Sequence, residues 1–147
     1  MLIEQISVFL ENKSGRLADV AKILEDQKIN IRALTIADTT DFGILRLIVD
    51  QPKKAEKILL ESGFTVRTTD VIAVEISDEP GGIVIPLKIL QEANVDIEYM
   101  YAFASKSNDK AFVILKVGDY ERVIEALIRQ NIKILNSQEV YQTEPGH

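Results

Sequence analysis

Residues 5–31 read QISVFLENKSGRLADVAKILEDQKINI, and residues 71–97 read VIAVEISDEPGGIVIPLKILQEANVDI. A shift of 66 residues aligns these stretches without a gap and places Ile6 on Ile72 and Ile31 on Ile97. Further along, the shift becomes 68 residues, and ILRLIVD at 44–50 meets FVILKVG at 112–118. A repeat of this length in two copies predicts a duplicated small domain and not a solenoid.

Each copy predicts the same series of elements. Alternating apolar residues predict a first strand at 5–10 and at 71–76, and apolar residues at helical spacing predict a helix after each. Two further strands follow, at 30–37 and 44–49 in one copy and at 96–104 and 112–117 in the other. A second helix comes next, at 55–59 and at 123–128, and a last strand ends each copy, at 64–69 and at 132–137. The order β-α-β-β-α-β, twice, is the ferredoxin-like plan of an α+β protein.

No glycine or proline separates the copies, because FTVRTTDVIAVEI at 64–76 runs from one predicted strand into the next. We therefore expect units at 1–70 and 71–143, a tail at 144–147, and the units side by side in a continuous eight-stranded antiparallel sheet with helices on one face. Some strand positions that would face away from the helices are also apolar, namely Ile44, Ile48, Phe112 and Ile114. Strands apolar on both faces are usually covered on both, which predicts a homodimer. Scattered exposed apolar groups are the alternative, and these are normal on protein surfaces.

The composition excludes several classes of function. The 147 residues carry a net charge of −6, no cysteine and one histidine, His147. This balance lacks the basic surface that nucleic acids require, and no apolar run reaches the roughly 18 residues of a membrane span. No nucleophile–base set, phosphate-binding loop or metal-ligand cluster is present, so we expect no enzyme activity, cofactor or metal. Without a basic, cleavable leader, the expected location is the cytoplasm.

The loops between the first strand and the first helix are ENKSGR at 11–16 and SDEPGG at 77–82. A helix start exposes unpaired N–H groups and the positive end of the helix dipole, which together suit a carboxylate or phosphate. Gly15, Gly81 and Gly82 would allow a ligand close to the backbone, and Pro80 suits a first helical turn. The alternative is that these residues only cap the helix and turn the chain.

Over nearly its whole length the chain resembles small tandem ACT-domain proteins. The residues that carry the likeness are SDEPGGI with LKILQEANVDIEYMYAF, and ENKSGRLADVAKILEDQKINIRAL. The resemblance implies a regulatory protein that binds an amino acid or similar small metabolite at the interface between paired units. By position, the implied ligand-binding residues are Asn12, Ser14, Gly15, Arg16, Leu17, Asn30, Ile31, Asp78, Pro80, Gly81, Gly82, Ile83, Asp96 and Ile97.

Roles for these residues follow as hypotheses. Backbone N–H groups of Gly15, Arg16, Gly81 and Gly82 would take the ligand carboxylate. An oxygen of Asp78, Asp96 or Asn30 would take its ammonium group, while Leu17 and Ile83 would contact its side chain.

The sequence also departs from the family pattern. Ser14 stands where the family usually has proline, and Asp96 where it usually has asparagine. Pro86 lies inside an expected helix, where it should remove a backbone hydrogen bond and kink the first turns.

Because the chain has no room for a catalytic domain beside two such units, the resemblance implies a stand-alone sensor. It would respond to its ligand by acting on a separate metabolic enzyme. The alternative is a protein–protein interaction module that has kept the fold and lost the pocket. Whether one loop or both bind is left open by the sequence.

Overall fold

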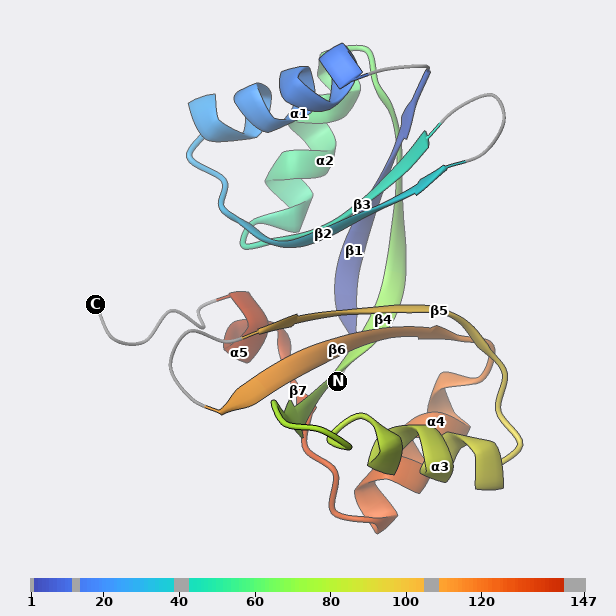
Figure 1. Cartoon of the computed structure of the whole chain (residues 1–147). Helices are drawn as coiled ribbons and strands as arrows, with labels where there is room; N and C mark the ends of the chain where they lie inside the picture. The colour runs from blue at the N-terminus through green and yellow to red at the C-terminus, as the bar shows by residue number, and fades with distance from the viewer. Residues whose placement is uncertain (1, 12–13, 39–42, 105–108, 142–147) are drawn as a thin grey trace. The chain divides into compact units, whose positions relative to one another are not determined.

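The computed structural model describes residues 2–11, 14–38, 43–104 and 109–141 (Figure 1). The chain divides into two compact units. The N-terminal unit is Glu4–Thr69, and the C-terminal unit is Asp70–His147 together with Met1–Ile3. Each unit is described by itself below.

The N-terminal unit contains all but the first residue of β1 (Ile3–Leu10), then α1 (Ser14–Asp26), β2 (Ile31–Asp38), β3 (Gly43–Val49), α2 (Pro52–Glu61) and the first part of β4 (Thr65–Ser77). The strand order is β2-β3-β1-β4. In the antiparallel pairing of β1 with β3, Ile6 lies opposite Leu47 and Val8 opposite Leu45. These residues belong to a buried core that also includes Leu24 of α1. Both helices lie on one side of the strands (Figure 1).

The C-terminal unit contains the rest of β4, α3 (Val84–Glu92), β5 (Ile97–Ala104), β6 (Lys110–Val117), α4 (Tyr120–Arg129), β7 (Ile134–Leu135) and α5 (Ser137–Tyr141). Its strand order, β5-β6-β4-β7, repeats the order of the N-terminal unit. A second core joins Ile72 and Val74 of β4 to Val123 and Leu127 of α4. Helix α4 begins after Asp119, whose side chain accepts a hydrogen bond from the Arg122 N–H at 3.1 Å. The acidic cap also complements the positive end of the helix.

The α+β class and the ferredoxin-like plan are confirmed, but the described residues form seven strands and not eight. The strands predicted at 64–69 and 71–76 are one strand, β4, and the boundary between the units falls inside it, between Thr69 and Asp70. No turn-forming residue stands there to interrupt it. The last strand is also shorter than predicted, because Asn136 ends it and opens α5.

Several residues predicted to face away from the helices are already buried in the single chain. Ile48 and Ile114 are 0% exposed and Phe112 is 5% exposed. The large apolar side chains that are exposed include Leu34 and Ile36 of β2, at 50% and 43%. No helix in the described ranges is long and apolar enough to cross a membrane.

Candidate functional site

The SDEPGG segment forms a tight turn between β4 and α3. The Gly82 N–H donates to the Glu79 carbonyl at 2.9 Å, and Gly81 has φ of +89°. Proline second and a positive-φ glycine third are the features of a type II turn, which only glycine or asparagine enters readily at the third position. A second turn follows, in which the Val84 N–H donates to the Gly81 carbonyl at 3.0 Å.

The glycines in this turn have structural reasons. A Cβ on Gly82 would stand 2.0 Å from the Ser77 carbonyl oxygen, so the two backbone segments approach too closely for any side chain. The Gly82 N–H is engaged within the turn and is not the free carboxylate donor that the sequence suggested. Among the described residues, the Gly81 N–H has no such acceptor.

Two predictions about prolines are wrong for one reason: α3 begins at Val84, later than expected. Pro80 lies in the turn that precedes the helix and not in its first turn. Pro86 is the third helical residue, where its missing N–H would have had no intrahelical partner. It therefore removes no helical hydrogen bond, and the first such bond runs from Leu87 to Ile83 at 3.4 Å.

A cavity of about 410 Å³ lies beside this turn, within the C-terminal unit. Its walls come from the end of β4, the turn, the start of α3, the start of β6 and the segment before β7. The lining residues are Glu75, Ile76, Ser77, Glu79, Pro80, Gly81, Gly82, Ile85, Pro86, Lys110, Asn131, Ile132 and Lys133. The volume falls within the range of small-molecule sites, roughly 300–1,000 Å³.

The cavity presents charges of both signs. The charged residues of its lining are Glu75, Glu79, Lys110 and Lys133. The Lys133 ammonium pairs with the Glu139 carboxylate at 3.0 Å, and this hydrogen bond, with the nearby charges of Glu139 and Glu75, raises the pKa of Lys133. A wall with fixed charges of both signs suits a zwitterion better than an apolar ligand.

Glu139 connects this cavity to α5. Its Oε1 accepts a hydrogen bond from the Asn136 N–H at 2.9 Å, and its own N–H donates to Asn136 Oδ1 at 2.8 Å. This reciprocal pair is a capping box. The Asn136 hydrogen bond, and then the Lys133 ammonium, lower the pKa of Glu139.

The equivalent positions in the N-terminal unit hold bulkier side chains. By the repeat, Arg16 corresponds to Gly82, and Phe64 corresponds to Ile132. The Arg16 guanidinium stacks on the Phe64 ring at 4.1 Å from the ring centre. The two positions that line the cavity of one unit are thus filled in the other by a cation–π pair.

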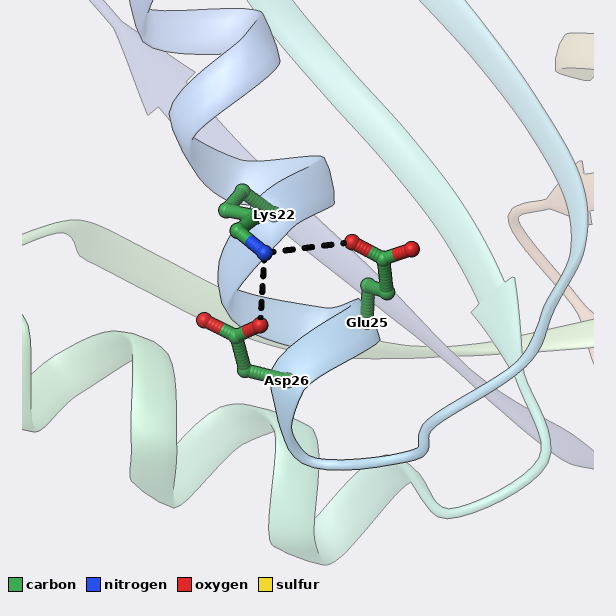
Figure 2. Close-up of polar contacts among 3 residues, drawn as sticks. All are labelled: Lys22, Glu25 and Asp26. Carbon is green, nitrogen blue, oxygen red and sulfur yellow. Dashed lines mark hydrogen bonds and ion pairs between the residues drawn. The ribbon is translucent and has the colours of Figure 1, made fainter.

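A second hollow, of about 420 Å³, lies in the N-terminal unit where α1 leads into β2. It brings together two predicted residues, Asn30 and Ile31. The Asn30 N–H donates to Asp50 Oδ1 at 2.9 Å, which fixes the backbone there. Glu25 also lines this hollow. Its carboxylate pairs with the Lys22 ammonium group at 3.5 Å, and the same ammonium group pairs with the Asp26 carboxylate at 3.0 Å (Figure 2).

The other predicted site residues divide into three groups. Asn12 lies outside the described residues, and Ser14 and Gly15 lie in the first turn of α1. Asp78 and Asp96 are exposed and line neither cavity. The apolar candidates Leu17, Ile31, Ile83 and Ile97 pack against the two cores.

Sequence reasoning missed the cavity residues outside the loop. Lys110 begins β6 and lies opposite Ser77 in the β4–β6 pairing. Lys133 reaches the same place because its carbonyl accepts a hydrogen bond from the Glu75 N–H at 3.0 Å. The signal that could have found them is strand register, since residues opposite the end of the first strand must lie beside the loop that follows it.

Solved structures of other proteins resemble this chain in fold. Protein BT0572 from Bacteroides thetaiotaomicron is 41% identical, with a TM-score of 0.91 over 97% of each chain. The regulatory subunit of aspartate kinase from Thermus thermophilus is 17% identical, with a TM-score of 0.63 over 86% of this chain and 91% of that one, a likeness of fold. A search of curated proteins finds no match. The family model described as an ACT domain pair matches residues 1–143. The chain therefore belongs to the ACT domain pair family.

Proposed function

We propose that this protein is a regulatory sensor that binds a free amino acid, or a similar small zwitterion, in the cavity of the C-terminal unit. The observation that carries the proposal is the composition of that cavity. Its lining combines residues of the SDEPGG turn with two glutamates and two lysines. An amino acid offers the complementary pair of charges, and charge-assisted hydrogen bonds are the strong ones.

The charges suggest how the ligand would lie. Its carboxylate would face Lys110, Lys133 and the Gly81 N–H, and its ammonium group would face Glu79 and Glu75. The ligand side chain would lie near Ile85 and Ile132.

The proposed sensor would act on a separate metabolic enzyme, as the family membership supports. The other predicted residues, in the loop at 11–16 and at the start of β2, remain predictions that the stoichiometry of ligand binding would test. Homodimer formation also remains a proposal. The exposed Leu34 and Ile36 on the edge strand β2 favour it, because an unpaired strand edge with apolar side chains is a common place for association.

The same exposed strand favours the second candidate function, a protein–protein interaction module without a ligand. The two functions differ in their response to small molecules. A ligand that binds only the folded state raises its stability by RT ln(1 + [L]/Kd), about 2.7 kcal/mol at a hundredfold excess over Kd. A module without a pocket gives no such response.

The test is a thermal-shift screen of the protein against the twenty amino acids, followed by calorimetry. We expect one chemical class of amino acid to raise the melting temperature, and Lys110→Met or Glu79→Gln to abolish the effect. Lys57→Met is the matched control, because Lys57 is an exposed lysine of α2 in the other unit. A flat response at millimolar concentrations would contradict the sensor and favour the interaction module.

A further inference from the structure

Lys133 belongs both to the wall of the cavity and to the anchoring of α5. It lines the cavity, and its ammonium group lies 3.0 Å from Glu139 Oε2. Its backbone is fixed against β4 by the hydrogen bond from the Glu75 N–H to the Lys133 carbonyl. The backbone of this lining residue is therefore held by β4, while its ammonium group pairs with α5.

The two oxygens of Glu139 have different partners. Oε1 accepts the Asn136 N–H and completes the capping box, and Oε2 accepts from Lys133. Helix α5 has only five residues, Ser137–Tyr141, so it depends on this cap and on the burial of Val140, which is 0% exposed. One carboxylate thus holds the first turn of α5 and at the same time neutralises a charge on the cavity wall.

The Lys133–Glu139 pair is open to competition. The Lys133 side chain is 54% exposed and that of Glu139 is 35% exposed. Ion pairs this accessible to water are weak, because the solvent screens both charges. A second carboxylate arriving from the cavity would compete with Glu139 for the same ammonium group.

We infer that Glu139 is an internal competitor for Lys133, and that a ligand carboxylate in the cavity weakens the hold of Lys133 on α5. The inference rests on the proposed function and adds its regulation: occupancy of the cavity changes how firmly α5 is held. Such coupling is reciprocal. If the ligand weakens the Lys133–Glu139 pair, the pair weakens ligand binding by the same free energy. Removal of the Glu139 charge should therefore strengthen ligand binding.

Glu139→Gln is the informative variant. Glutamine at the third helical position can still accept the Asn136 N–H in a capping box, so α5 keeps its cap while the competing charge is lost. We expect affinity for the amino acid selected in the screen to tighten by about two- to fivefold, the size of an exposed ion pair. The matched control is Glu125→Gln, which removes the exposed partner of Arg129 on α4, and it should leave affinity unchanged.

Backbone amide NMR gives the second measurement. Unmodified protein would be titrated with sodium acetate, the simplest carboxylate, against sodium chloride at equal ionic strength, and separately with the selected amino acid. We expect the amide signals of Ile132 beside the cavity, of the cap residue Asn136 and of Glu139 in α5 to move with the same midpoint. Movement of the Ile132 signal alone, or unchanged affinity in Glu139→Gln, would overturn the competition.

The outcomes separate the two proposals. If acetate moves both groups of signals while no amino acid does, the sensor proposal fails and the competition for Lys133 stands. If an amino acid binds and the α5 signals stay still, the sensor stands and the competition fails. If neither titrant moves the signals of α5, no carboxylate competes with Glu139.

Discussion

At the scale of single residues, the two glycines of the SDEPGG turn were expected to let a ligand approach the backbone, and the turn itself also requires them. Gly81 adopts φ of +89°, and Gly82 lies against the Ser77 carbonyl. Both are explained by the path of the backbone alone. The charged residues around them, and not the glycines, are therefore the ones whose substitution would test binding without disturbing the turn.

Substitution of Gly82 by alanine should destabilise the fold. The new Cβ would overlap a backbone oxygen, and backbone cannot move aside as a flexible side chain can. We expect a loss of about 1–3 kcal/mol in the free energy of unfolding, the usual size of an overpacking defect, measured by urea denaturation. Gly118→Ala is the control, since a Cβ there meets nothing within 4 Å. Equal stability of the two variants would show that the approach of Gly82 to Ser77 is not a constraint.

At the scale of the elements, the sequence predicted the helices and strands whose hydrophobic spacing was clear. It did not predict where a helix begins when turn and capping residues determine that start. The alternation in β1 and β6 and the helical spacing in α4 are strong local signals. The start of α3 and the whole of α5 depend on turn and cap geometry. The pattern Asn136-x-x-Glu139 was present in the sequence as a capping box, yet the residues around it also suited a longer strand.

The candidate site was predictable to a smaller extent. The loop that borders the cavity could be located, because a duplicated strand–loop–helix pattern marks it. Lys110 and Lys133 could not, because they reach the cavity through pairing with β4 and through the path of the chain before β7. Contacts between segments distant in sequence require a register, and local composition does not supply one.

Helix α4 offers a test of capping at this scale. Asp119 accepts the Arg122 N–H, and the helix carries Val123 and Leu127, both 0% exposed, into the core. We expect Asp119→Ala to lower the free energy of unfolding by about 1 kcal/mol, because an unpaired N–H remains at the helix start. Asp119→Asn should cost less, since asparagine also caps well. The measurement is urea denaturation followed by circular dichroism. An alanine variant with an unchanged free energy of unfolding would contradict the capping role.

At the scale of the whole molecule, one pair of positions shows how the two copies have diverged. The C-terminal unit has Gly82 and Ile132 beside its cavity, and the N-terminal unit has Arg16 stacked on Phe64 at the equivalent positions. A duplicated fold therefore need not carry two equal sites. The N-terminal unit uses these positions for an internal contact.

This divergence predicts the stoichiometry of binding. Calorimetry with the amino acid selected in the screen should give one site per chain, because the Arg16–Phe64 contact of the N-terminal unit occupies the positions that border the cavity in the C-terminal unit. Arg16→Gly introduces the residue that the other unit has at this position. The number of sites should stay at one, because positions 42 and 65, which correspond to Lys110 and Lys133, hold no lysine. Two sites per chain in the unmodified protein would contradict the assignment.

Strand β4 has a consequence for how such a chain can change over time. Insertions and deletions are tolerated in exposed loops and not within paired strands. Because the boundary between the copies lies inside β4, between Thr69 and Asp70, no loop is available there to receive a spacer or a new domain. The loss of either copy at that boundary would leave the other with a truncated strand. The two copies should therefore be inherited as one unit, free to diverge in their side chains and not to separate.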